Sequence, residues 1–410
     1  MRVLYTAAHA GFAEESVPLG GGAAVANQLI AEWTRTRPFE LEVIDPSVLG
    51  ASAPSGRELV RFGERAYARF CHAFGEATTK RVLEHDPTDT AVLVNDVSEG
   101  PDFQRIAERG FRLFTIYHVD VVAYVADIYA RGWVQPETLV RLYDRFSALT
   151  PSMARLVFEK QLQTVLFSRK IIVPSLRMRE VIESCYGARA QDKVEVMPWG
   201  TWAEEPDEAA LNAELLKLRS EFQIVEGTRV LLTLSRISPE KGQDLLLKAL
   251  REWHPAEPVV LFICGEAAFM QGLRYLDRLK AVTCPHIRVI FPGYVTGLRK
   301  QAFQRLADLY IFPSKHESYG LTLLEALHAG LPAVCLDHHG AREIMGPELG
   351  RVVSAKGLRP AIEELLADNA GHRKMSQAAS QYARQHSFSS TAAMLAELMA
   401  SNRAVAKGSG

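Results

Sequence analysis

The chain has 410 residues, and its 47 Lys and Arg residues nearly balance its 48 Asp and Glu residues, for a formal net charge of -1. This balance argues against a protein that wraps nucleic acid through bulk positive charge. Hydrophobic residues make up 48% of the chain, too many for a disordered protein. No apolar run approaches the roughly 18 residues that a membrane-spanning helix needs. The length exceeds what one hydrophobic core usually serves, so we expect two domains.

Short apolar segments alternate with longer helical patterns along the whole chain. In the first half these strand candidates are Arg2–Tyr5, Glu40–Asp45, Thr90–Asn95, Arg112–His118, Lys170–Pro174 and Lys193–Met197. In the second half they are Arg229–Ser235, Pro258–Cys264, Ile287–Phe291, Asp308–Phe312, Pro332–Leu336 and Gly350–Ser354. Most are continuously apolar, which is typical of parallel strands covered on both faces. The alternation predicts an α/β protein with two Rossmann-like, doubly wound parallel-sheet domains.

The boundary between the domains is expected where Pro198-Trp199-Gly200 ends a strand and an acidic polar stretch follows. We therefore predict a first domain over residues 1–200 and a second domain over residues 201–387. A tail helix over about residues 388–403 has an amphipathic pattern and is expected to cross back to the first domain.

A glycine run, Gly20-Gly21-Gly22, follows the first predicted strand and opens a long helix. Glycines at this place let a phosphate or a sugar approach the backbone without a Cβ atom in the way. A flexible surface loop would have the same composition, so the run alone leaves both interpretations open.

A basic stripe is predicted on one long helix within Ser55–His85, where Arg57, Arg61, Arg65 and Arg69 recur every four residues. Such a helix can rest on anionic lipid, which makes peripheral membrane contact a hypothesis. A solvated amphipathic helix packed on its own domain is the stronger interpretation.

Polar residues at strand ends of the first half are candidates for a ligand-binding site. His118, Asp120 and Tyr124 follow the fourth predicted strand, and His9 lies near the end of the first. Ligands of open α/β sheets bind at the carboxyl ends of the strands. A hydrogen-bonded structural histidine is the competing interpretation of His118.

The segment Ser235–Asp244 directly follows the first strand of the second half, where a phosphate-binding loop belongs. Arg236 and Lys241 can clamp a diphosphate, Arg as a planar fork and Lys as a point charge. The segment is not a Walker loop, and it contains no GxGxxG pattern, which argues against a nicotinamide-cofactor site. Taken alone, both cations would most often be solvated loop charges.

A second loop of this kind runs from a predicted strand into a helix over Ser314–Ala326. Gly320 allows close approach of the backbone, and the amides of Leu321 and Thr322 would face an anion at the helix start. Glu317 and Glu325, eight residues apart, suit an extended ligand with hydroxyl groups at both ends. As an isolated pair, they would more often be solvated charges at a helix end.

Together these segments resemble the family-4 retaining glycosyltransferases with the GT-B fold, in which two Rossmann-like domains face a cleft. The resemblance rests on Arg236, Lys241-Gly242, Glu317 and Glu325 with seven residues between them, Gly20-Gly21-Gly22, Val173-Pro174-Ser175 and Pro198-Trp199-Gly200. The last segment departs from the Pro-Asn-Gly of many relatives.

The resemblance also implies roles for single residues. Arg236 and Lys241 would neutralise the donor diphosphate, while Glu317 would hold the donor sugar and Glu325 the ribose. The further expected donor contacts are Gly21, Gly22, Gly320, Leu321 and Thr322. His118 would lie beside the sugar and the acceptor, so we count it with Glu317, Arg236 and Lys241 as a catalytic candidate. The candidates for the acceptor side are His118, Asp120, Tyr124 and His9.

The expected reaction is transfer of a hexose-type sugar from a nucleoside-diphosphate sugar to a hydroxyl of a small molecule, glycan or lipid-linked sugar, with retention. The chain has no DxD triplet, so we expect no divalent metal and no other cofactor. Two alternatives remain: a nucleotide-sugar epimerase on the same fold, and a non-catalytic sugar-nucleotide-binding subunit.

The five cysteines are odd in number and form no CxxC pair, which suggests neither a disulfide framework nor a zinc site. A cytoplasmic protein is expected, with a peripheral position at the inner membrane face left open by the basic stripe.

Overall fold

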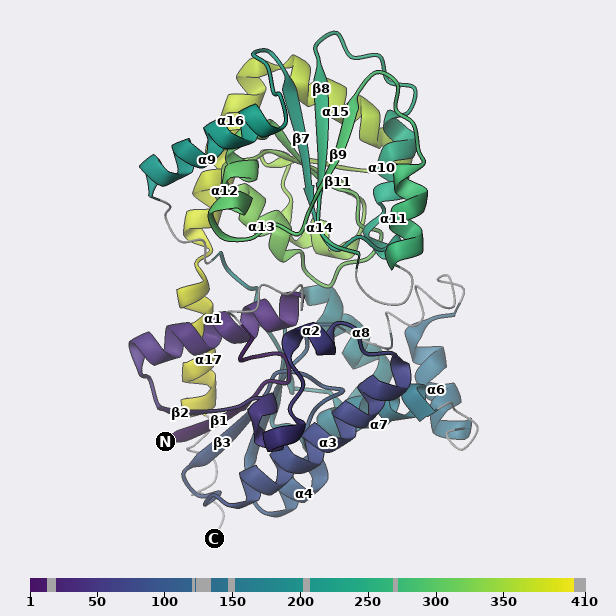
Figure 1. Ribbon diagram of the computed structural model, residues 1–410. Coiled ribbons are helices and arrows are strands. Elements are labelled where there is room, and N and C mark those ends of the chain that lie inside the picture. Colours follow the sequence, from purple (N-terminus) through teal and green to yellow (C-terminus); the bar gives the residue numbers. More distant parts are fainter. Residues whose placement is uncertain are drawn as a thin grey trace. The chain divides into compact units, whose positions relative to one another are not determined.

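The computed structural model describes residues 1–12, 20–119, 122, 134–146, 152–201, 207–267 and 272–401 (Figure 1). The chain divides into two compact units, Met1–Trp199 with Ser389–Gly410, and Gly200–Phe388. Each unit is built on one six-stranded sheet. All strand pairings within the two sheets are parallel.

The sheet of the first unit has the order β2-β1-β3-β4-β5-β6. Its strands are β1 (Arg2–Thr6), β2 (Glu40–Ile44), β3 (Thr90–Val94), β4 (Arg112–Ile116), β5 (Lys170–Val173) and β6 (Val194–Val196). The sheet of the second unit has the order β12-β11-β10-β7-β8-β9. Its strands are β7 (Arg229–Leu234), β8 (Val259–Cys264), β9 (Arg288–Gly293), β10 (Leu309–Phe312), β11 (Ala333–Leu336) and β12 (Gly350–Val353). All twelve predicted strands and the doubly wound α/β class are confirmed.

The helices of the first unit connect its parallel strands. They are α1 (Gly21–Thr36), α2 (Gly56–Leu59), α3 (Glu64–Leu83), α4 (Phe103–Glu108), α6 (Pro136–Phe146), α7 (Ser152–Phe167) and α8 (Leu176–Tyr186). One of its cores packs Leu4 of β1 and Val92 of β3 against Phe103 and Ile106 of α4. Burial of such side chains, at about 25 cal/mol per Å² of apolar surface, holds the helices on the sheet.

The helices of the second unit lie in two groups, one on each face of its sheet (Figure 1). They are α9 (Glu208–Glu221), α10 (Gln243–Leu250), α11 (Gly272–Lys280), α12 (Gly297–Leu306), α13 (Leu321–His328), α14 (His339–Ile344), α15 (Leu358–Ala367) and α16 (Asn369–Gln385). The core beneath α10, α11 and α15 takes alternate residues of the strands, such as Leu309 and Ile311 of β10. Alternation places these residues on one face of the pleated sheet.

The tail helix α17 (Phe388–Ser401) belongs to the first unit from Ser389 onward. The indole N–H of Trp33 in α1 donates a hydrogen bond of 3.1 Å to the carbonyl of Ala392. Leu395 and Met399 are fully buried, and Arg112 of β4 donates to the carbonyl of Met399 at 3.1 Å. The apolar stripe of the tail therefore completes the core of the first unit.

Each sheet reverses its direction of winding once. In the first unit β1 lies between β2 and β3, and in the second unit β7 lies between β10 and β8. The chain therefore leaves β1 and β7 first to one side and later to the other. Ligands of doubly wound sheets bind at the carboxyl ends of the strands at such a point.

The predicted single basic helix is wrong, because the segment forms two helices. Ser55 accepts a hydrogen bond from the N–H of Glu58 at 3.3 Å, and Glu58 accepts one from the N–H of Ser55 at 2.8 Å. This capping box starts the short helix α2, which carries Arg57. A separate helix, α3, begins after Gly63 and carries Arg65 and Arg69.

The apolar residues beside the basic stripe have partners within the first unit. Leu59 and Phe70 are buried in a cluster with Ala8 and Phe74. Within the part of the chain that the structure describes, no helix is long and apolar enough to cross a membrane. Membrane contact and a cytoplasmic location stay predictions.

Candidate functional site

Two loops meet at the winding reversal of the second unit. The loop after β7 makes a turn over Pro239–Lys241 and enters α10 through Gly242, whose φ is 65°. The loop after β10 lies against it, since the N–H of Lys315 donates to the carbonyl of Glu240 at 2.8 Å. A Cβ atom on Gly242 would lie 2.0 Å from the carbonyl oxygen of Pro313. Only glycine permits this approach of the two backbones.

An ion pair joins the two loops. The Lys241 Nζ atom lies 2.6 Å from Oε1 of Glu317, and both side chains are largely buried. The Ser314 hydroxyl donates to the same oxygen at 2.8 Å. The sheet therefore brings together two predicted site residues that are 76 positions apart in the sequence.

The Glu317 carboxyl is ionised in this surrounding. Burial raises its pKa, but the charge and hydrogen bond of Lys241, with smaller contributions from His338 and Ser314, outweigh burial and hold the pKa below its usual value. The site therefore holds a carboxylate and an ammonium that neutralise one another. A bound dianion would compete with Glu317 for Lys241.

The other predicted donor residues lie on the same two loops or at the start of the helix that follows the second loop. Gly320 has a φ of 110° and precedes α13, in which Leu321 and Thr322 are the first residues, so their N–H groups have no acceptor within the helix. The Arg236 side chain is about one-third exposed and lies 3.9 Å from Glu240.

Glu325, on the next turns of α13, is engaged by a residue that the sequence analysis did not single out. Lys300 of α12 lies 2.9 Å from its Oε1 atom. Ser314 and His338 are further residues without a predicted role at this site. Their signal was their place just after β10 and β11, since β10 pairs with β7 and β11 lies next to β10.

A second polar cluster lies at the winding reversal of the first unit. Asn95 Oδ1 lies 2.9 Å from His118 Nε2, and Asn95 Nδ2 donates to the carbonyl of Gly22 at 3.4 Å. A Cβ atom on Gly22 would lie 3.1 Å from His118 Cδ2. The structure thus brings Gly22 and His118 together; Gly21 starts α1 beside them. The His118 ring stacks on Trp199 at a centroid distance of 5.9 Å.

His9 joins this cluster through a carboxylate after β3. Its Nδ1 atom lies 3.3 Å from Asp96 Oδ1, and Asp96 Oδ2 accepts from the N–H of Ala8 at 3.0 Å. The Tyr67 hydroxyl lies 3.4 Å from His9 Nε2 and donates to Glu99. Sequence reasoning missed Asn95, Asp96 and Glu99, although all three lie in the loop that follows β3. Asp120 and Tyr124 lie outside the described residues.

The two histidines of this cluster differ in charge at neutral pH. Burial would lower the pKa of His9, but the charge and hydrogen bond of Asp96, aided by Glu99, raise it to about 9. Burial lowers the pKa of His118 to about 4, although the negative charge of Asp96 opposes this change. At neutral pH His9 is an imidazolium paired with Asp96, and His118 is a neutral imidazole.

The stability of the first unit should therefore depend on pH through His9. A pKa raised in the folded state stabilises fully below the unfolded value of about 6.5 and ceases to stabilise as the pH rises through about 9. We expect unfolding of this unit to become easier across that window, by on the order of 3 kcal/mol. Urea unfolding at a series of pH values checks this, with His9→Gln as the variant that should lose the dependence. An unchanged pH dependence in His9→Gln would contradict the pairing.

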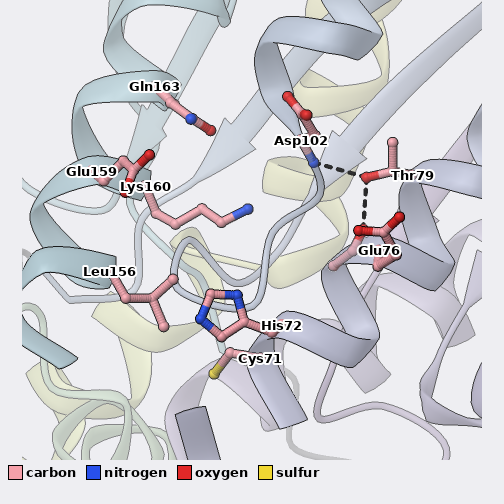
Figure 2. Close-up of a pocket in the computed structure, with 10 residues that line it drawn as sticks. Cys71, His72, Glu76, Thr79, Asp102, Leu156, Glu159, Lys160 and Gln163 are labelled. Atoms are coloured by element: carbon pink, nitrogen blue, oxygen red, sulfur yellow. Dashed lines mark hydrogen bonds between the residues drawn. The ribbon is translucent and has the colours of Figure 1, made fainter. Parts of the chain in front are cut away.

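A separate pocket of about 220 Å³ lies in the first unit between α3 and α7 (Figure 2). Lys160 projects across it and donates to the carbonyls of Gly100 and Pro101 at 2.7 and 2.8 Å. The Thr79 hydroxyl accepts from the N–H of Asp102 at 2.8 Å. These bonds hold the loop between β3 and α4, and none of the predicted site residues lines the pocket. Among the described residues, no three His, Cys, Asp or Glu side chains gather as a metal site.

Comparison with known proteins places the fold. Residues 216–386, which lie within the second unit, match the family model Glycosyl transferases group 1. The solved structure of HepE from Anabaena in complex with UDP and glucose aligns with a TM-score of 0.65 at 17% identity, over 98% of this chain and all of that one. WaaG, a glycosyltransferase involved in lipopolysaccharide biosynthesis, aligns with a TM-score of 0.66 at 17% identity, over 97% of this chain and 99% of that one. The predicted GT-B fold is confirmed.

One similar protein is the alpha-monoglucosyldiacylglycerol synthase of Streptococcus pneumoniae. It is 29% identical over 224 residues, which are 54% of this chain and 47% of that protein. The chain thus matches about half the length of this curated relative.

Proposed function

We propose that the protein is a retaining, metal-independent glycosyltransferase of family 4. It would move a hexose-type sugar from a nucleoside-diphosphate sugar to a hydroxyl of a small molecule, a glycan or a lipid-linked sugar. The observation that carries the proposal is the buried pair of Lys241 and Glu317 where the second sheet reverses its winding. The group 1 domain over residues 216–386 and the UDP and glucose bound to HepE support it.

The donor site combines cations, free amides and carboxylates. Arg236, Lys241 and the first N–H groups of α13 would stabilise the negative charge that develops on the departing diphosphate. This arrangement supplies the charge that a divalent metal would otherwise provide. Glu325 would bind the ribose of the donor once its ion pair with Lys300 is broken.

The sugar would be held by Glu317, whose carboxylate accepts hydrogen bonds from hydroxyl groups and favours an oxocarbenium-like transition state. Attack on the same face as the departing phosphate, with that phosphate taking the acceptor proton, would retain the configuration. The acceptor would be bound by the first unit, where His118 is a neutral imidazole at hydrogen-bond distance from Asn95. A neutral imidazole can donate to or accept from a hydroxyl group without drawing in an anion.

The test starts from a panel of nucleoside diphosphates and their sugars, titrated calorimetrically, followed by product masses from an acceptor panel. We expect donor consumption that requires an acceptor, and a product with the anomeric configuration of the donor. Conversion of the donor into another nucleotide sugar without an acceptor would identify an epimerase. Donor binding without turnover would identify a non-catalytic subunit.

Glu317→Ala should lose transfer by at least about tenfold, because the sugar loses a charge-assisted partner. The control is Glu364→Gln, which alters an exposed carboxylate of the same unit that pairs with Arg351 and should turn over as the wild type does. Transfer by Glu317→Ala near the wild-type rate would remove Glu317 from the catalytic residues.

A further inference from the structure

His338 has a fixed tautomer and one unused hydrogen-bond donor. It directly precedes α14, and its Nδ1 atom accepts a hydrogen bond from the N–H of Ala341 at 3.1 Å. Since Nδ1 accepts, the proton of the neutral ring lies on Nε2. The side chain is 7% exposed, and Nε2 is buried without a hydrogen-bond partner among the described residues. A buried donor of this kind costs about 1–3 kcal/mol for as long as it lacks an acceptor.

The first turn of α14 packs directly on the loop that carries Glu317. A Cβ atom on Gly340 would lie 3.1 Å from Glu317 Cβ and 2.7 Å from the carbonyl oxygen of Tyr319. The His338 ring makes an edge contact with Phe312, the last residue of β10, at a centroid distance of 5.3 Å. Burial lowers the pKa of His338 to about 4, and the charge of Glu317 is the largest influence that opposes it. The neutral ring thus stands on a segment packed against the Glu317 loop, within range of the Glu317 charge, with an N–H group that it can donate.

Donor binding creates a need for this N–H. In the proposed function Lys241 must face the diphosphate, but in this structure it is paired with Glu317. A buried carboxylate that loses its only cation is destabilised by several kcal/mol. The Ser314 hydroxyl, the other group bonded to Glu317 Oε1, carries no charge.

We propose that His338 is a positioning residue for Glu317. When the diphosphate draws Lys241 away, the Nε2–H group of His338 donates to the Glu317 carboxylate, keeps it ionised and orients it toward the sugar hydroxyls. The histidine keeps its proton throughout, and the bond to Ala341 keeps the ring in place. This inference rests on the proposed donor site.

The variant His338→Asn separates the two roles of the side chain. Asparagine can still cap α14, but it has no group at the position of Nε2. We expect an unfolding midpoint and a nucleoside-diphosphate affinity like those of the wild type, with an affinity for the nucleoside-diphosphate sugar about tenfold lower. The control is His339→Asn, an exchange at the exposed neighbour, which should leave both affinities unchanged.

Wild-type affinities in His338→Asn, or an equal loss for both ligands, would overturn the inference. In a Glu317→Gln background His338→Asn should cost nothing further, because the carboxylate that it serves is gone; an additive loss would also overturn it. A wild-type protein that binds no nucleoside-diphosphate sugar would instead overturn the proposed function, and this inference with it.

Discussion

Replacing Lys241 with alanine is expected to destabilise the second unit by about 3 kcal/mol and to abolish measurable binding of the nucleoside diphosphate. The side chains of Lys241 and Glu317 are only 14% and 16% exposed, so the variant leaves a buried carboxylate without its cation. Removal of one partner from such a pair costs far more than the pair itself contributes. Urea unfolding and calorimetric titration with the nucleoside diphosphate measure the two effects.

Two further variants separate stability from binding. Lys315→Ala removes an exposed lysine of the neighbouring loop, whose pair with Asp244 is 39% and 44% exposed, so it should cost less than about 1 kcal/mol. The double variant Lys241→Ala with Glu317→Gln should regain most of the lost stability, because no unpaired charge remains, but it should still not bind the diphosphate. If Lys241→Ala lost no more stability than Lys315→Ala, the ion pair of Lys241 and Glu317 would not have the energetics of a buried pair.

The fold was largely predictable because its signals are local. Each strand is an apolar run bounded by turn residues, and such a run can be located without knowledge of the rest of the chain. The prediction of a single basic helix was wrong for a reason that is also local. The four-residue repeat of Arg57 to Arg69 continues across Gly63, but the helix that begins at the capping box of Ser55 and Glu58 ends at Leu59, and the next helix begins only after Gly63. The periodic pattern hid the break, although Gly63, a poor helix-forming residue, marks it in the sequence.

The site was predictable only in part because its contacts join distant segments. That Lys241 pairs with Glu317 depends on β10 lying beside β7, which one sequence does not reveal. The cluster of Asn95, Asp96 and His9 depends in the same way on β3 lying beside β1. The rule that ligands bind at strand ends identifies candidates on every strand. Choosing among them requires the strand order, because the winding reversal decides which ends face a ligand.

Replacing Gly242 with alanine should lower stability and affinity by similarly large amounts, because the added Cβ atom would clash with backbone rather than with a movable side chain. The new Cβ atom would lie 2.0 Å from the Pro313 carbonyl oxygen, at a residue whose φ is 65°. The two loops can relieve the clash only by separating, which breaks the bond between Lys315 N–H and the Glu240 carbonyl. We expect a loss of about 3 kcal/mol or more in the unfolding of the second unit, and a nucleoside-diphosphate affinity at least about tenfold lower, a change of 1.4 kcal/mol.

The matched control is Gly227→Ala, since Gly227 has a φ of 79° and no atom within 4 Å of an added Cβ. This variant has the strain of the left-handed backbone alone, about 1 kcal/mol, and lies away from both loops. The difference between the two alanine variants therefore measures the contact of the loops. If Gly242→Ala lost no more stability than Gly227→Ala and still bound the diphosphate, the close approach of the two backbones would not be what builds the anion site. If it lost stability but kept its affinity, Lys241 could reach the diphosphate without the loop geometry, and the site would depend on charge alone.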